Sequence, residues 1–467
     1  MFQPIFPRIR DSNLAKKMNE DFDTIGGFYA PLSNLVTGLG HGNGLATAAT
    51  YDQDYRLTSL KVLNGAATVS NLAYAYGDGI NLTGITDGVT AANSNVLGYS
   101  PANRLTSATG PWGTESFTYD AVGNRLNDNV TSGATTTTRL AAYPTTSNRI
   151  VSLNQNAATF RTYAYDAGGN ITTDTRPGET FVFTYNKRNR LSALTRNAVA
   201  YATYGYNALE EMTTRSTSAV GGPTGQVAYV YDLDGHLIAE ATASTGATTR
   251  DYIWLAANDN APIDMPLAVA EAASLYMVHT DHLGRPIRMT DATKATVFQA
   301  IYKPYGEVYS TSGTKAQNLR FPGQYFQIET GFAYNWHRHY DPVTGRYTQP
   351  DPLRFVDGSS IYNYAGSSPL IKTDRDGQIL VVDPRSIFDW LFPPKPQTCS
   401  AGPNLSPNVF AAPGNQMPTV IKNAWSNDGG PPDKCKWLSD NSDKFSTADI
   451  KAAEKVWGCR RSRWNRE

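Results

Sequence analysis

Two aspartates in the last third of the chain have the residue type that acid–base hydrolysis requires. Asp351 opens the segment Asp-Pro-Leu-Arg-Phe, and Asp374 opens Asp-Arg-Asp-Gly-Gln after a gap of eighteen residues. Two carboxylates can hydrolyse an amide when they lie close enough to share a proton, because one then activates water while the other protonates the leaving nitrogen. Aspartate before proline also commonly caps a turn, so a purely structural role stays open.

Four histidines form two close pairs, a spacing that metal sites use. His337 and His339 are two residues apart, and on a strand such residues share a face and could chelate an ion. His279 and His282 form the other pair. No carboxylate or cysteine completes a recognisable ligand set for either pair. We therefore expect structural histidines, no bound metal and no cofactor.

The cysteines are confined to the end of the chain. Cys399, Cys435 and Cys459 all lie in the last seventy residues, so the first 398 residues can hold no disulfide and no thiolate metal site. Cys435 and Cys459 could pair in an oxidising compartment. Residues 379–467 contain no histidine that could activate a nucleophilic cysteine.

A repeated unit must position these residues. A tyrosine followed five residues later by a polar residue recurs every 20 to 25 residues, at Tyr51, Tyr76, Tyr99, Tyr119, Tyr143, Tyr165, Tyr185, Tyr206 and Tyr231. Each copy has an alternating stretch such as residues 181–185, a turn of Asp, Asn and Gly, and a second alternating stretch such as residues 190–194, which is typical of a β-hairpin. One hairpin cannot bury its aromatic face, so the hairpins must pair edge to edge into a sheet that curls.

The composition also favours an all-β fold. The chain has 39 Gly, 27 Tyr and only 18% charged residues, which suits short strands and tight turns. Lys+Arg and Asp+Glu are both 41, so the chain as a whole has no electrostatic preference for nucleic acid or anionic membranes. No apolar run reaches about 18 residues, and residues 1–10 lack the apolar region of a secretory signal. Export would need another route or an upstream part.

The repeats resemble the YD repeats of bacterial Rhs proteins, teneurins and toxin-complex C subunits. After residue 240 come unique motifs that resemble the Rhs-associated core domain, namely residues 250–255, 279–286, 305–307, 320–324 and 340–347. The resemblance covers roughly residues 25–378. It implies an all-β hairpin spiral that forms a partial hollow shell around a cargo chain. Nine repeats are few for a complete shell, so we expect the C-terminal part of a longer ancestor or a partial gene copy.

The resemblance also implies a domain organisation and a cleavage site. The expected parts are an N-terminal segment (1–24), YD repeats (25–240), the core domain (241–378) and a variable tail (379–467). Rhs proteins carry a paired Asp-Pro-x-Gly-Leu motif that resembles an intramolecular aspartic protease. By that likeness Asp351 and Asp374 are the catalytic dyad, and the cut falls between Gln378 and Ile379.

Several residues depart from that motif. Arg354 and Phe355 replace its first Gly and Leu, Arg375 replaces the second Pro, and Gln378 replaces the Leu before the cut. A cation such as Arg375 beside the dyad would keep both carboxylates ionised, which opposes a shared proton. Autoproteolysis and turn capping therefore stay open as alternatives.

The tail has a composition of its own. From residue 379 there is no Tyr and no His, and 12 Lys+Arg stand against 9 Asp+Glu, a net charge of +3. It is expected to be mostly irregular, with one helix at about residues 447–457 after a capping box. By resemblance such tails are polymorphic toxins, often nucleases. A ribonuclease built on Arg, Lys, Ser or Asp stays open, with Lys451, Lys455 and Arg460 as candidates, and exposed helix residues are the simpler interpretation.

Three hypotheses for the function follow. The first is a secreted or surface-associated shell that houses an effector for competition between bacteria. Its implied partners are an immunity protein and secretion-system components, with nucleic acid only if the tail is a nuclease. The second is an adhesion module for glycans or a target-cell surface, and the third is a truncated, inactive copy.

Overall fold

The computed structural model describes residues 27–29, 35–77, 79–218, 225–255 and 265–382, together with Leu438, Asn441 and Lys444. The chain divides into two compact units, Met1–Pro393 and Pro394–Glu467. The predicted N-terminal segment, the three cysteines, the predicted tail helix and its basic candidates Lys451, Lys455 and Arg460 lie outside the described residues. The predicted domain boundaries at residues 24, 240 and 378 stay predictions.

The first unit is built from β-strands. The strands are β1 Gly27–Tyr29, β2 Val36–Gly40, β3 Ala46–Tyr51, β4 Leu57–Asn64, β5 Ala67–Tyr76, β6 Leu82–Asp87, β7 Asn95–Tyr99, β8 Leu105–Gly110, β9 Gly113–Tyr119, β10 Arg125–Ser132, β11 Thr135–Ala142, β12 Ser152–Gln155, β13 Ala158–Tyr165, β14 Ile171–Arg176, β15 Glu179–Tyr185, β16 Leu191–Arg196, β17 Val199–Tyr206, β18 Met212–Thr217, β19 Gly225–Tyr231, β20 Leu237–Thr242, β21 Thr248–Trp254, β22 Pro266–Glu271, β23 Ser274–Thr280, β24 Pro286–Thr290, β25 Thr296–Tyr302, β26 Val308–Gly313, β27 Tyr325–Gln327, β28 Phe332–Asn335, β29 Arg338–Asp341, β30 Arg346–Tyr347, β31 Lys372–Asp374 and β32 Leu380–Val382. Two short 3-10 turns, η1 Ala91–Asn93 and η2 Ala365–Ser367, complete the regular structure of the described residues.

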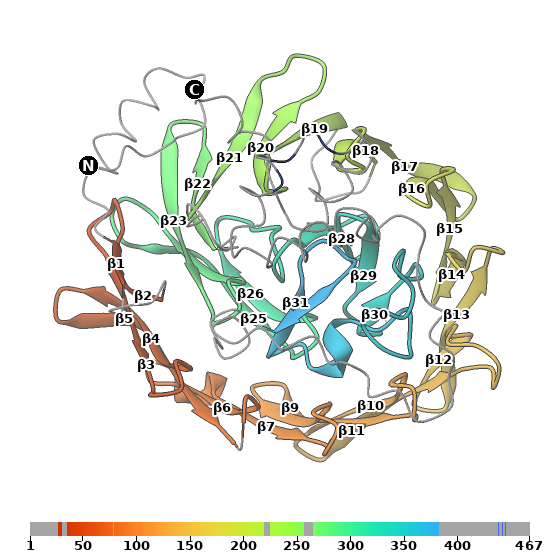
Figure 1. Cartoon of the computed structure of the whole chain (residues 1–467), viewed down its shortest axis with the longest axis horizontal. Coiled ribbons are helices and arrows are strands. Elements are labelled where there is room, and N and C mark those ends of the chain that lie inside the picture. The colour runs from red at the N-terminus through yellow and green to blue at the C-terminus, as the bar shows by residue number, and fades with distance from the viewer. Residues whose placement is uncertain are drawn as a thin grey trace. The chain divides into compact units, whose positions relative to one another are not determined.

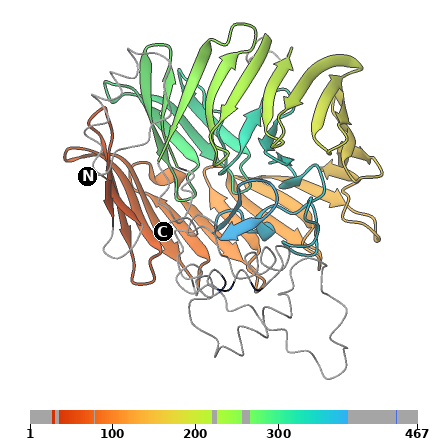
Figure 2. The ribbon, with the colours of Figure 1, turned by 45° about the horizontal axis from the view of Figure 1, so that its top comes forward.

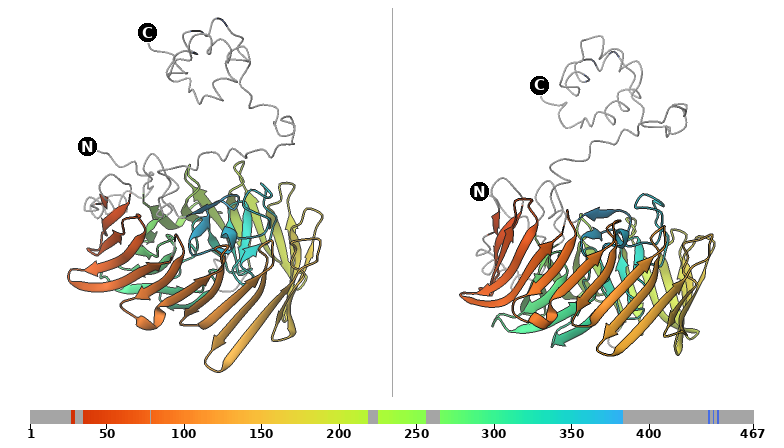
Figure 3. Two further views of the ribbon diagram at one scale, coloured as in Figure 1. Left: turned by 60° about the horizontal axis from the view of Figure 1, so that its bottom comes forward. Right: turned by 90° about the horizontal axis from the view of Figure 1, so that it is seen from below.

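One antiparallel sheet of 26 strands contains β1 to β26, and each strand pairs with the next along the chain. The strands follow a curve that surrounds β28 to β31 (Figure 1). The same curved wall is seen from other directions in Figure 2 and Figure 3. The predicted all-β hairpin spiral is confirmed. No helix among the described residues is long and apolar enough to cross a membrane.

The repeated tyrosine links one strand to the next. Eight of the nine repeat hydroxyls donate a hydrogen bond of 2.5–3.0 Å to a backbone carbonyl at the start of the preceding strand or just before it. The donor from Tyr185 to the Ile171 carbonyl, at 2.8 Å, is one of them. The buried Tyr99 hydroxyl has no partner among the described residues. The repeat thus requires tyrosine, because phenylalanine would fill the same space without this bond.

In six of the nine repeats the aspartate or asparagine that follows the tyrosine holds the polar turn. In the turn after β9, Asp120 Oδ1 accepts the backbone N–H groups of Val122 and Asn124 at 3.1 and 2.8 Å. Gly123 in the same turn has a φ of 95°, a conformation that glycine adopts without a steric penalty. The sequence pattern therefore encodes a specific tight turn.

The concave face of the sheet packs on the segment that follows it. Phe181 and Phe183 are buried on one face as predicted, and Phe183 stacks on Phe332 of β28 at 5.8 Å. A buried ion pair of 3.4 Å joins Arg215 of β18 to Glu329. Residues 319–382 therefore fill the inside of the curve, where β27–β30 form one small sheet and β31–β32 another.

The first strands of the spiral meet the later ones. Asn43 Nδ2, between β2 and β3, donates to Thr290 Oγ1 at 3.0 Å and to the Asp291 carbonyl at 2.9 Å. Beside this contact the rings of His41 and His279 meet edge to face at 4.7 Å. We call this contact between β2–β3 and β23–β24 the seam.

Candidate active site

The two predicted aspartates converge on one arginine. Asp351 follows β30, Asp374 ends β31, and Arg338 begins β29. Arg338 Nη2 lies 3.0 Å from Asp351 Oδ2 and 2.8 Å from Asp374 Oδ2. Asp351 Oδ2 and Asp374 Oδ2 both contact Arg338 Nη2, so the distance between these two oxygens is at most the sum of the two contact distances. Residues that are 23 positions apart in the sequence thus form one buried carboxylate pair.

The cation in this pair differs from the one expected from the sequence. Arg375 was expected beside the dyad, but its guanidinium donates to the Asp234 carbonyl and lies 3.1 Å from His236 Nε2. Arg338 is instead the cation between the carboxylates, and it is only 1% exposed. Its guanidinium lies 3.6 Å from the ring centre of Tyr347, which holds it in place.

Burial and charge act in opposite directions on the two carboxyl groups. Burial raises the pKa of Asp351 and of Asp374 above their usual values, while Arg338 lowers both. Asp374 accepts three donors: Arg338, the Tyr347 hydroxyl at 2.8 Å, and the Gln378 N–H at 3.0 Å. Raised pKa values make a shared proton easier to hold, whereas Arg338 between the groups opposes it.

Turn capping, the simpler alternative, is also present. Asp351 Oδ1 accepts the backbone N–H of Leu353 at 2.7 Å, and the Arg354 N–H donates to the Asp351 carbonyl at 3.0 Å. A cap and a dyad member use different oxygens of Asp351, so the geometry is compatible with both roles.

The predicted cleavage bond lies between two backbone groups that carboxylates hold. On its upstream side the Gln378 N–H donates to Asp374 Oδ1 and to Asp376 Oδ1, each at 3.0 Å. On its downstream side the Leu380 N–H donates to Asp357 Oδ2 at 2.8 Å. Ile379 between them is 49% exposed, so water can reach the bond.

Close backbone packing brings this segment to the site. A Cβ on Gly377 would lie 2.5 Å from the Asn335 carbonyl oxygen, and Gly377 has a φ of 73°. The Asn335 amide donates to the Asp374 carbonyl at 2.8 Å and to the Tyr347 hydroxyl at 2.7 Å. Glycine at 377 therefore lets the loop after β31 lie against the β28–β29 hairpin, next to Arg338.

The four paired histidines each contact another protein group. His337 Nδ1 contacts the Asp376 carbonyl at 3.0 Å, whereas His339 Nδ1 contacts Gln349 Oε1 at 3.2 Å. His279 Nε2 contacts a threonine hydroxyl, and His282 Nε2 donates to the Leu370 carbonyl. These contacts agree with structural roles for all four.

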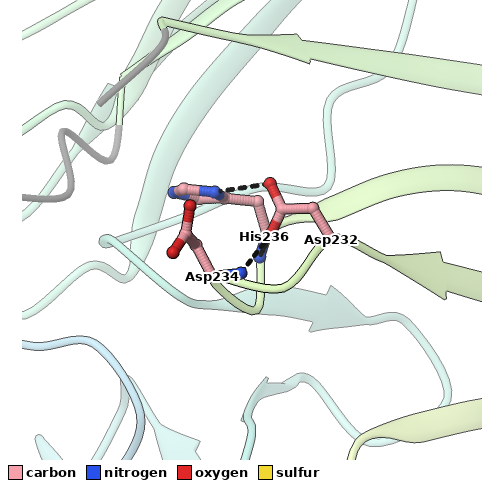
Figure 4. A group of neighbouring side chains, drawn as sticks. All are labelled: Asp232, Asp234 and His236. Carbon is pink, nitrogen blue, oxygen red and sulfur yellow. Dashed lines mark hydrogen bonds and ion pairs between the residues drawn. The ribbon is translucent and has the colours of Figure 1, made fainter. Parts of the chain in front are cut away.

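One group in the described part of the chain has the spacing of a metal site. Asp232, Asp234 and His236 offer ligand atoms within 4.8 Å of one another (Figure 4). His236 Nδ1 is hydrogen-bonded to Asp232 Oδ2 at 2.9 Å, and the Arg375 guanidinium lies beside His236 Nε2. Asp232 also caps its turn, as the equivalent aspartate or asparagine does in five other repeats. The repeat turn explains this cluster without an ion.

Sequence reasoning missed three residues of the candidate site. Arg338, Tyr347 and Asp357 contact the carboxylates or the cleavage segment, yet each lies outside the paired aspartate motif. Tyr347 ends the core motif of residues 340–347 and Arg338 lies two residues before it, and this motif is the signal that could have drawn attention to them. Asp357 has no signal in the sequence.

Comparisons with known proteins agree with the fold. A family model described as Teneurin YD-shell matches residues 37–363. Double-stranded DNA deaminase toxin A of Burkholderia cenocepacia is 27% identical over 320 residues, which cover 58% of this chain and 20% of that protein. The tRNA nuclease WapA of Bacillus subtilis is 27% identical over 298 residues, which cover 60% of this chain and 12% of that protein.

A solved structure shows the same fold. The Photorhabdus luminescens Tc holotoxin pore superposes with a TM-score of 0.61 at 19% sequence identity, and the match covers 76% of this chain and 19% of that one. The chain thus spans about a fifth or less of each of these three proteins. The structural likeness concerns the fold alone.

Proposed function

Because this chain belongs to the teneurin YD-shell family, we propose that it is part of an encapsulation and delivery protein whose variable tail is an effector in competition between bacteria. The observation that supports this most is that two relatives which match more than half of this chain are named as a toxin and a nuclease. An effector of this kind requires an immunity protein in the producing cell, which would be the principal partner. Both relatives come from bacteria.

We propose further that the chain releases this tail by cutting itself between Gln378 and Ile379. Water adds to the Gln378 carbonyl carbon, the bond to the Ile379 nitrogen breaks, and the nitrogen takes up a proton. The products are a carboxylate at Gln378 and an amine at Ile379. Asp374, with its three donors, is the better ionised base, so Asp351 is the acid.

Arg338 has a positioning role in this proposal. It holds both carboxylates within reach of one water molecule and of the loop that carries the cleavage bond. Its charge also disfavours the protonated acid, so a proton on Asp351 depends on burial of the site. Cleavage is therefore expected to be slow, which suits a reaction that occurs once in each molecule.

Intact mass measurement of the purified full chain tests the proposal. Wild type should yield fragments 1–378 and 379–467, while Asp351→Asn and Asp374→Asn should stay whole. Asn keeps the shape of each side chain but cannot exchange the proton. An uncut wild type would contradict autoproteolysis and would favour the adhesive module and the inactive copy over the released effector.

Growth of bacteria that express the full chain tests the effector proposal. Wild type should arrest growth in a host without the immunity protein, and the uncut Asp351→Asn variant should arrest it less. Equal growth of host cells with wild type, with the variant and with an empty vector would contradict an active tail.

A further inference from the structure

A third carboxylate holds the downstream side of the cleavage bond. Asp357 lies in the same loop as Asp351, and its Oδ2 accepts the Leu380 N–H at 2.8 Å. The pKa of Asp357 is raised to about 6. Burial is the largest cause, and the nearby charges of Asp374 and Asp351 add to it, although the Leu380 N–H and Arg338 oppose the shift. Asp357 therefore belongs to the same cluster as the dyad.

The strand beyond the bond is aligned by its neighbour. β32 pairs with β31 in the register Asp374↔Leu380 and Thr373↔Val381. Asp357 adds a side-chain hydrogen bond at the first residue of β32, where the pairing begins. The Ile379 nitrogen, which is the leaving group of the proposed reaction, is thus one residue away from a fixed N–H.

The upstream side is held separately. The Gln378 N–H is bound by Asp374 and Asp376, so its position depends on the dyad itself. Without Asp357, the bond would be fixed by a side chain on one side only and could swing away from the dyad. The rate of an amide cleavage falls steeply when the reacting groups are misplaced by even about 1 Å.

We infer that Asp357 is a positioning residue for self-cleavage, which holds the Leu380 N–H so that the Gln378–Ile379 bond stays beside Asp351 and Asp374. This role rests on the proposed autoproteolysis. It requires an oxygen acceptor at position 357 and does not require Asp357 to exchange a proton. It also places a carboxylate next to the ammonium group that cleavage creates at Ile379.

A pulse–chase experiment with the full chain made in a cell-free system tests this role. The rate at which fragment 379–467 appears is compared for wild type, Asp357→Ala and Asp357→Asn. The Ala variant should cut about tenfold more slowly, the effect of losing one hydrogen bond to a charged acceptor. The Asn variant keeps an amide oxygen for Leu380 and should cut within about twofold of wild type.

A matched control uses an aspartate of the first repeat. Asp52 also accepts backbone N–H groups, from Asp54 and Arg56 at 2.9 Å each, but in the β3–β4 turn. Asp52→Ala should leave the cleavage rate unchanged. Thermal unfolding of each variant shows whether the fold is intact. If Asp357→Ala is unfolded, the comparison of Asp357→Asn with wild type decides, and slow cleavage by the folded Asn variant would overturn the inference.

The outcomes separate the two proposals. Slow cleavage by Asp357→Ala together with rescue by Asp357→Asn would support the positioning role. A wild-type rate in a folded Asp357→Ala variant, while Asp351→Asn stays whole, would overturn the positioning role and leave autoproteolysis standing. A wild-type chain that is never cut would overturn both.

Discussion

The seam should lose stability in acid because it holds a neutral histidine. His41 is 7% exposed, and its ring contacts Thr47 Oγ1 at 2.8 Å and the ring of His279 at 4.7 Å. Burial lowers the pKa of His41 from 6.5 to about 4. Burial also lowers the pKa of His279, with smaller contributions from His41 and Arg288. A charge on His41 would therefore lie in a buried site beside a threonine hydroxyl and a second histidine.

The sign and size of the effect follow from linkage. Between pH 6.5 and pH 4 the unfolded chain binds a proton at His41 and the folded chain does not, so stability falls as the pH falls through this window. Each pH unit in the window is worth about 1.4 kcal/mol. Lowering the pH from 7 to 5 should therefore remove about 2 kcal/mol of the contribution of His41 to the free energy of unfolding.

Urea unfolding at several pH values provides the assay, with His41→Gln as the comparison. Titrating groups away from the seam contribute equally to both proteins, so the difference in unfolding free energy reports on His41 together with its effect on the neighbouring His279. Wild type should lose about 2 kcal/mol relative to His41→Gln between pH 7 and pH 5. A difference that stays constant over this range would show that His41 is not buried in its neutral form, and would refute the described seam.

Two further predictions concern the repeat tyrosine and the altered motif. Tyr185→Phe removes the hydrogen bond to the preceding strand and should lower the free energy of unfolding by about 1 kcal/mol. Tyr99→Phe should change the free energy of unfolding little, because the Tyr99 hydroxyl has no partner among the described residues. Urea unfolding of both variants checks this. Arg354→Gly should raise the thermal midpoint, because Arg354 has a φ of 66° and the left-handed conformation costs a residue with a side chain about 1–2 kcal/mol. An unchanged or lower midpoint would contradict that reasoning.

The repeats made the fold predictable from the sequence. The tyrosine spacing and the alternation around Phe181 and Phe183 predict hairpins with one aromatic face, and the structure has both. The sequence could not reveal the partner of that face. Phe183 stacks on Phe332, about 150 residues later in the chain. Such a contact depends on how far the sheet curls, which local patterns do not encode.

The candidate site was predictable only where a motif marks it. Asp351 and Asp374 were found because they resemble the paired aspartate motif of Rhs proteins, and the structure brings them together. Arg338 was missed because an arginine in a tyrosine-rich segment has many ordinary roles, and its function depends on two carboxylates that reach it from other loops. Asp357 was missed because its partner is a backbone N–H, which leaves no trace in a sequence.

Two of the altered motif residues have side chains in surroundings other than the carboxylate pair. Phe355 is 65% exposed, and Arg375 reaches to the turn after β19. Arg354 keeps the left-handed backbone that a glycine at this position would adopt easily, so the turn at Asp351 survives with some strain. The changes therefore alter the surroundings of the dyad more than its geometry. Whether the chain cuts itself should then depend on the proton that Asp351 holds against Arg338, which the Asp351→Asn comparison addresses directly.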